Sequence, residues 1–158
     1  MADITASITS TLTIKHLQGA VHGVSDLATV RVGAIAGTST EDTFSRLRIS
    51  YRKFATLQDG LDALRERKLD AFVYPTWSYP PRLIGDLNTP GGDNSQVFSP
   101  TTGWPAINVP MGYTRGTLPV GMTFFGRAWS EASLFKFAFA YEQATRHRHP
   151  PASVPPLR

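Results

Sequence analysis

The sequence predicts a single three-layer α/β domain, in which a parallel βαβαβ unit is extended by a β-hairpin and a C-terminal helix. Short apolar runs alternate with segments of helical spacing between residues 30 and 74, which indicates parallel strands joined by crossover helices. Two β-rich runs, 106–109 and 120–125, flank a turn at Arg115-Gly116 and indicate the hairpin. A chain of 158 residues has the length of one domain.

The first half of the chain alternates strands with helices. Val30–Ala36 and Leu69–Tyr74 are short, nearly continuous apolar runs, typical of strands that are buried on both faces. Hydroxyl residues followed by Glu41 and Asp42 predict the N-cap and first turn of a helix that ends near Leu47. The remaining elements expected in this half are strands over Thr11–Ile14 and Ile49–Phe54 and a helix over Leu57–Arg67.

Proline divides the chain in two. All 12 prolines lie in residues 75–158, and residues 1–74 contain none. We therefore predict one hybrid domain over residues 1–158, made of a fragment 1–74 and a fragment 75–158, with the strand that ends at Tyr74 central in a shared sheet. A long irregular stretch over 75–103 opens the second fragment, and it is expected to be a functional loop, a packed Ω-like excursion or a partly disordered segment.

The C-terminal helix is expected over Ser130–Arg146 and is apolar nearly all round. Leu134, Phe137 and Tyr141 share one face, whereas Phe135 lies off it, so burial from two sides is expected. The three tryptophans are most simply explained by packing in the core and loops.

Composition excludes several classes of function. The formal net charge is +4, but the basic residues are scattered singly, so no nucleic-acid partner is expected. The absence of cysteine excludes disulfides and thiolate chemistry. No signal-peptide pattern and no stretch of 18 apolar residues occurs, so we expect a cytoplasmic protein with no membrane partner. His147 and His149 stand beside arginines at a helix end, where basic groups complement the dipole, so no metal and no cofactor is expected.

Two segments of the chain carry family resemblances. Residues 8–74, with ITSTLTIKHLQGAVHGVSDLATVRVGAIAGTSTEDTF and FATLQDGLDALRERKLDAFVY, resemble the second lobe of periplasmic amino-acid-binding proteins and the ligand-binding domain of ionotropic glutamate receptors. Residues 69–158, with DAFVYPTWSYPPRLIGDLNTPGGDNSQ, SPTTGWPAINVPMGYT and LPVGMTFFGRAWSEASLFKFAFAYEQATRHRHPP, resemble the C-terminal part of amidase-signature hydrolases. On this interpretation the chain is a chimera, engineered or recombined from two protein fragments.

The amidase resemblance implies an enzyme that works through a serine nucleophile, a second serine and a lysine, with the nucleophile in a glycine- and serine-rich stretch. That stretch is missing, and none of the four lysines, Lys15, Lys53, Lys68 and Lys136, lies in the family's catalytic context. We therefore expect no catalytic residues, no enzyme activity and a non-catalytic scaffold. An amide hydrolase remnant is a distant alternative.

The binding-protein resemblance implies a ligand site at the start of one helix. Thr38, Ser39 and Thr40 would supply hydroxyls and backbone N–H groups to the carboxylate of an amino acid or another small ligand. The alternative is an ordinary helix cap without a ligand. Pro75 replaces the acidic residue that the family places after the strand, so any binding is expected to be weak. A homo-oligomer is expected as well, because both fragments would lack surfaces that cover them in the parent families.

Overall fold

The fold is built on one mixed sheet of five strands. The computed structural model describes residues 29–89 and 98–150, and its strands lie in the order β2-β1-β3-β5-β4. Strand β1 runs parallel to β2 and β3, whereas β5 runs antiparallel to β3 and β4. The strands are β1 (Val32–Ile35), β2 (Arg52–Phe54), β3 (Ala71–Pro75), β4 (Ala106–Thr114) and β5 (Leu118–Phe125).

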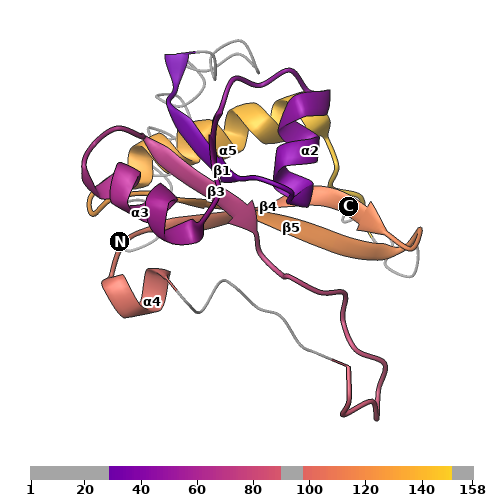
Figure 1. Cartoon of the computed structure of the whole chain (residues 1–158). Coiled ribbons are helices and arrows are strands. Elements are labelled where there is room, and N and C mark those ends of the chain that lie inside the picture. Colours follow the sequence, from indigo (N-terminus) through magenta and orange to yellow (C-terminus); the bar gives the residue numbers. More distant parts are fainter. Residues whose placement is uncertain (1–28, 90–97, 151–158) are drawn as a thin grey trace, which may run out of the picture.

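Helices cover both faces of the sheet and complete three layers. Figure 1 shows α5 and α2 above the sheet and the short α4 below it. Helix α3 packs on the same face as α4, since its buried residues share a cluster with Phe98 and Phe125. The predicted α/β class, the parallel βαβαβ unit, the hairpin and the C-terminal helix are therefore confirmed. The helices are α2 (Ser39–Arg46), α3 (Leu57–Arg65), α4 (Ser99–Thr102) and α5 (Glu131–Thr145).

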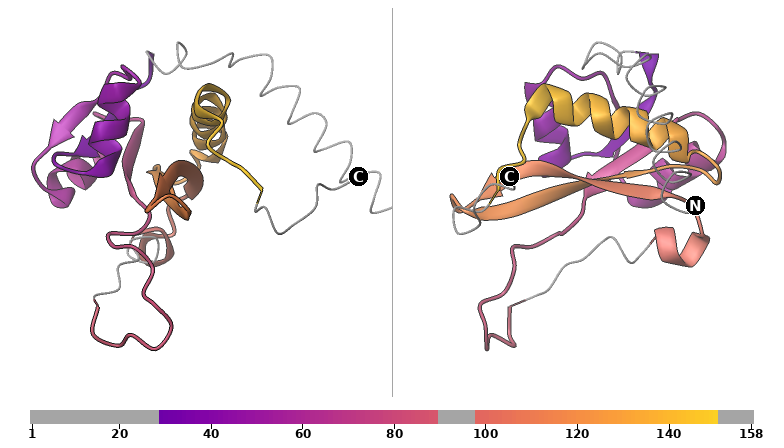
Figure 2. Two further views of the ribbon diagram at one scale, coloured as in Figure 1. Left: turned by 90° about the vertical axis from the view of Figure 1, so that its right-hand side faces the viewer. Right: turned by 180° about the vertical axis from the view of Figure 1, so that it is seen from behind.

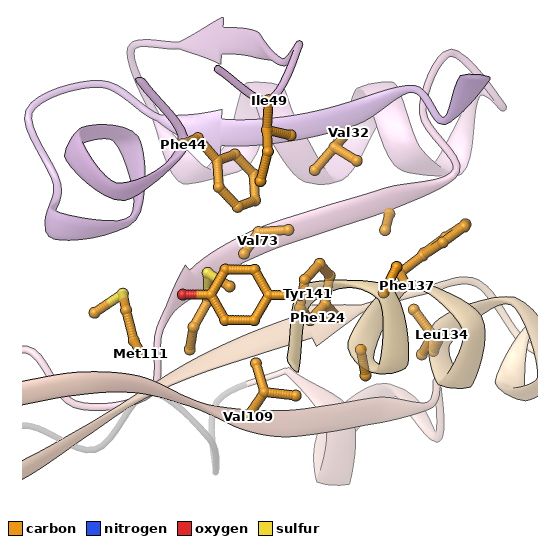
Figure 3. Packing of buried hydrophobic residues seen from close by; sticks show 14 residues of the cluster. Val32, Phe44, Ile49, Val73, Val109, Met111, Phe124, Leu134, Phe137 and Tyr141 are labelled. Carbon is orange, nitrogen blue, oxygen red and sulfur yellow. The ribbon is translucent and has the colours of Figure 1, made fainter. Parts of the chain in front are cut away.

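Strand β3 is central and separates the two hydrophobic clusters. Its side chains alternate between the faces: Ala71 and Val73 enter the cluster under α2 and α5, and Phe72 and Tyr74 enter the cluster under α3 and α4. Figure 3 shows the first cluster, in which Val73 lies between residues of α2 and α5. Burial on both faces explains the unbroken apolar run in the sequence.

The two halves of the chain are joined by more than the sheet. Arg127, in the connection between β5 and α5, donates from Nη1 to the carbonyl oxygens of Leu64 and Leu69, at 3.2 and 2.7 Å. These carbonyls lie at the end of α3 and in the connection from α3 to β3, so one side chain of the second half holds the end of a helix in the first half. The described halves therefore share packing, sheet and side-chain hydrogen bonds.

The structure departs from the expectations in three places, whereas the predicted strand Thr11–Ile14 lies outside the described residues and stays a prediction. The irregular stretch contains α4, a single turn that begins at Ser99. Phe135 on α5 is 51% exposed, so the described residues bury only one side of this helix. Trp129 is 92% exposed, which makes core packing the wrong interpretation for it. The apolar periodicity of a helix alone does not say whether a second layer covers it.

Residues 76–89 form an arm that leaves the carboxyl end of β3. Figure 2 shows the arm projecting away from the sheet in two further views. Apart from Thr76 and the partly covered Pro80 and Asp86, its side chains are exposed, and they include Leu83 at 78% and Ile84 at 106% exposure. Large apolar side chains are rarely exposed to water next to one another, so the arm is a candidate interaction surface.

Candidate functional site

Two cavities meet at the carboxyl ends of β1 and β3. In open α/β sheets this edge is the usual place for a ligand, because strand ends and helix N-termini leave room and polar groups there. The smaller one, the strand-end cavity, has a volume of about 400 Å³ and extends from Ile35 to Phe98. The larger one, the hairpin cavity, has a volume of about 820 Å³ and lies between α2 and the β4–β5 hairpin. The two share Ser39, Pro75, Trp77 and Ser78 in their walls.

Helix α2 begins at this edge, and its N-terminus is already satisfied by the chain itself. Thr38 is the N-cap: its Oγ1 accepts from the Glu41 N–H and donates to the Ile35 carbonyl oxygen. The Glu41 carboxylate accepts the Gly37 N–H at 2.6 Å, which completes a reciprocal cap. Its ion pair and hydrogen bond with Lys53, followed by the Gly37 N–H, hold the pKa of Glu41 below its ordinary value. A carboxylate of the protein thus already accepts one of the backbone N–H groups at this helix start.

The structure separates the three hydroxyl residues expected to bind a ligand together. Ser39 is exposed and lines both cavities. Thr38 lines the strand-end cavity, but its hydroxyl is engaged in the cap. Thr40 is fully buried, and its Oγ1 has no hydrogen-bond partner among the described residues. Successive residues of a helix point about 100° apart, so three in a row cannot face one ligand. Carboxylate binding by these three residues stays a prediction. In this geometry it would involve the Ser39 side chain and backbone N–H groups.

The hairpin cavity combines aromatic and cationic walls. Trp77 and Tyr79 at the root of the arm are 54% and 50% exposed, and both line the cavity. Arg46, in the last turn of α2, and His147, just after α5, line it from the other side. Burial, followed by the nearby charges of Arg46 and His149, lowers the pKa of His147.

The segment after α5 is held on the hairpin by an aromatic contact. The Tyr113 hydroxyl donates to the His149 carbonyl oxygen at 3.3 Å, and the two rings stack with centroids 6.2 Å apart. Because His147 lies two residues before this contact, the contact fixes the imidazole at the cavity wall. The hairpin therefore positions a basic side chain that belongs to the C-terminal segment.

A chain of polar side chains crosses three strands beside the cavities. The Thr76 and Thr123 hydroxyls are 2.9 Å apart and share a hydrogen bond, and Thr123 Oγ1 also donates to Asn108 Oδ1 at 2.7 Å. Thr76 and Thr123 are buried, whereas Asn108 is exposed. With its carbonyl oxygen occupied, Asn108 presents its amide N–H groups to solvent.

Three of the four lysines lie in the described part of the chain, and Lys136, on α5, lines neither of the two cavities. Lys53 pairs with Glu41, and Lys68 pairs with Glu66 at 2.6 Å, so both amines are held by carboxylates. Lys15 lies outside the described residues. No cluster of three His, Asp or Glu side chains suited to a metal ion occurs within residues 29–89 and 98–150.

Several residues of these cavities are not predicted as a site by the sequence. Core and loop packing is the simplest explanation of Trp77 there, Tyr79 carries no signal, helix-end electrostatics account for His147, and no role is predicted for Arg46. One signal is available for Trp77, since residues directly after a buried parallel strand lie at the ligand-binding edge. Nothing in the sequence indicates that the segment after α5 returns to that edge.

The fold is that of an α/β protein, and the comparisons place it in a family. A family model described as Amidase matches residues 13–135, more than half of the chain. This chain belongs to the amidase family.

Curated relatives agree with this assignment. The chain is 41% identical over 98 residues to a probable amidase of Arabidopsis thaliana, a match that covers 61% of this chain and 16% of the relative. It is 33% identical over 117 residues to a glutamyl-tRNA(Gln) amidotransferase subunit of Synechococcus, covering 69% of this chain and 22% of the relative. The chain thus spans about a fifth of the length of these relatives.

Solved structures give the same picture of the fold. A glutamyl-tRNA(Gln) amidotransferase subunit of Thermotoga maritima matches with a TM-score of 0.58 at 15% identity, over 80% of this chain and 44% of that one, which shows a shared fold. The native peptide amidase of Stenotrophomonas maltophilia matches at 44% identity and a TM-score of 0.47, over 60% of this chain and 18% of that one.

These findings correct the interpretation of the chain as a chimera. The amidase match begins at residue 13 and runs through the segment that resembles binding proteins, and nothing supports a second parent family. The chimeric scaffold predicted from two fragments is therefore wrong, because the chain is a fragment of one family, the amidases. The resemblance to binding proteins rested on a strand–helix alternation that many α/β families share, so the pattern identifies a supersecondary unit and not a family.

No helix in the described part of the chain is long and apolar enough to span a membrane.

Proposed function

We propose that this chain forms part of an amide hydrolase, in which it builds a wall of the substrate site and does not carry the nucleophile. Membership of the amidase family over residues 13–135 is the observation that carries the proposal. The two cavities at the carboxyl ends of β1 and β3 give the chain a surface on which an amide substrate would lie.

The chemistry of the chain supports a binding role. Amide hydrolysis through a serine needs a base within hydrogen-bond reach of the hydroxyl. Of the three lysines among the described residues, Lys53 and Lys68 pair with carboxylates, and Lys136 lies outside the walls of both cavities, so none is placed as that base there. The cavity walls, in contrast, offer the aromatic surface of Trp77 and the exposed hydroxyl residue Ser39, which suits substrate contact.

A segment exchange tests this function. The 98-residue segment of the Arabidopsis probable amidase that matches this chain is replaced by the segment from this chain, and ammonia release from simple amides is measured. The exchanged protein, shown to be folded by circular dichroism, should hydrolyse the amides that the relative hydrolyses, and Trp77→Ala in it should raise KM. The chain alone should release no ammonia. A folded exchange protein without activity, or turnover by the chain alone, would contradict the proposal.

Two further expectations from the sequence remain proposals beside it. Weak binding of a small carboxylate at the start of α2 would involve Ser39, which lines both cavities. Self-association would cover the apolar side chains of the arm, and light scattering coupled to size exclusion measures it directly.

A further inference from the structure

We infer that the hairpin cavity binds ligands that join a carboxylate to an aromatic or apolar body, with Arg46 as the partner of the carboxylate. The inference concerns binding by the chain itself and does not depend on the proposed amide hydrolysis. It assigns a binding role to Arg46, for which the sequence predicts none, and to Tyr141, which is otherwise a core residue.

The charge of the cavity favours an anion. The Arg46 guanidinium lines it, and no Asp or Glu is among its lining residues. Within residues 29–89 and 98–150, no carboxylate lies within ion-pair distance of Arg46, although Arg31, Lys53, Arg65 and Lys68 all have acidic partners. A guanidinium with its donors free in a concave site is well suited to a bidentate carboxylate.

The opposite wall is apolar and aromatic. The rings of Trp77, Tyr79 and Tyr113 line the cavity, each between 43% and 54% exposed. Half-exposed aromatic rings bury much area when a flat apolar group stacks on them. A volume of about 820 Å³ accommodates a ligand of the size of a blocked amino acid or dipeptide.

A buried hydroxyl lies in the core next to residues that line this cavity. Tyr141 on α5 is fully buried, and its hydroxyl has no hydrogen-bond partner among the described residues. Figure 3 shows the oxygen pointing toward the end of the core that Phe44 and Met111 occupy, and Met111 also lines the cavity. The Tyr141 ring lies 6.4 Å from the His147 ring, another lining residue. An unpaired buried donor is costly, and a ligand oxygen would satisfy it.

The Tyr141 hydroxyl is protonated at neutral pH, as any tyrosine with an ordinary pKa of 10 is. Burial raises its pKa further, to about 12, while the charge of Arg46 opposes part of that rise. At neutral pH the hydroxyl is therefore a donor. Arg46 and Tyr141 together would present a cation and a neutral donor to one carboxylate, whereas the Glu41 carboxylate already accepts a backbone N–H group at the start of α2.

The test compares a carboxylate with its matched amide on the whole chain. Binding of N-acetylphenylalanine and of N-acetylphenylalaninamide is titrated by ligand-observed NMR, in which hydrolysis of the amide would also be seen. The acid should bind about tenfold more tightly than the amide, a difference of about 1.4 kcal/mol, because only the acid forms a charged pair with Arg46. Equal affinities, or no saturable binding of the acid by the folded chain, would overturn the inference.

Variants locate the site. Arg46→Gln should abolish the preference for the acid, whereas Arg48→Gln, which removes the same charge from an arginine outside the cavity walls, should retain it. Tyr141→Phe removes no hydrogen bond within the described chain and should weaken acid binding about fivefold. An equal loss in both arginine variants would show general charge attraction and overturn the site, and unchanged binding in Tyr141→Phe would overturn the role of the hydroxyl. Because activity is not measured, an inactive segment-exchange protein would leave these results untouched.

Discussion

The hydrogen bonds of Arg127 test whether the two halves of the chain unfold together. Its Nη1 donates to two backbone carbonyl oxygens, those of Leu64 at 3.2 Å and Leu69 at 2.7 Å. A hydrogen bond from a charged donor contributes about 1.5–3 kcal/mol, and the longer of the two lies at the outer limit of good geometry. Arg127→Met keeps much of the length of the side chain but removes both bonds, so the free energy of unfolding should fall by about 2 kcal/mol.

The assay is urea denaturation of the whole chain, followed by far-ultraviolet circular dichroism and by tryptophan fluorescence. Both probes should report one transition in the wild type and in Arg127→Met, with the same m-value, because the shared sheet keeps the halves cooperative. In a thermal melt the same loss should lower the Tm by about 6 °C for a chain of this length. Arg82→Met, at an exposed position of the arm, is the matched control and should change stability by less than about 0.5 kcal/mol.

Two outcomes would refute this reasoning. If Arg127→Met is as stable as the Arg82→Met control, the two carbonyl contacts contribute nothing to stability. If the two probes separate into distinct transitions in the wild type, the sheet does not make the halves one folding unit.

Three further predictions address the core, the helix cap and the polar side chains. A Cβ at Gly60 would overlap the ring of Phe72, so Gly60→Ala should lower the denaturation midpoint although alanine gains about 1 kcal/mol in helix propensity. A higher midpoint would show that α3 moves away from the ring at little cost. The folded-state pKa of Glu41 lies below its ordinary value of 4.5, so the ionised carboxylate stabilises the fold above pH 4.5 and this stabilisation is lost as the pH falls through the folded-state pKa. The free energy of unfolding should therefore depend less on acid pH in Glu41→Gln than in the wild type. An identical pH profile would contradict that role. Thr123→Val removes the hydroxyl that bonds to both Thr76 and Asn108, so the free energy of unfolding should fall by about 1–3 kcal/mol. Thr123→Ser keeps a hydroxyl and should retain most of the stability in the same denaturation assay.

The order and type of most elements could be predicted from the sequence, because apolar periodicity reports local structure. Val30–Ala36 and Leu69–Tyr74 predicted two strands within two residues of their observed bounds at either end. The strand order could not be predicted, since it depends on contacts between segments far apart in the chain. The turn at Ser99 was missed because four residues carry no helical period.

The candidate site was predicted less well than the fold. A helix start indicates possible donors, but the direction of each side chain depends on packing, which buries Thr40 and engages Thr38 in the cap. The return of His147 to the strand ends depends on the stacking of Tyr113 on His149, two residues 36 positions apart. Family assignment failed for the first half because parallel strand–helix units resemble one another across unrelated proteins.

The position of β3 in the sheet has a consequence for synthesis on the ribosome. The chain emerges from its N-terminus, so β1, β2 and β3 are complete while β4 and β5 are still being translated. During this interval the edge of β3 that later pairs with β5 exposes its backbone hydrogen-bonding groups. A strand buried on both faces in the finished sheet is therefore the last of the first three to gain its second partner, and nascent chains stalled after β3 has left the ribosome but before β5 has should be the ones that chaperones bind and that aggregate when chaperones are absent.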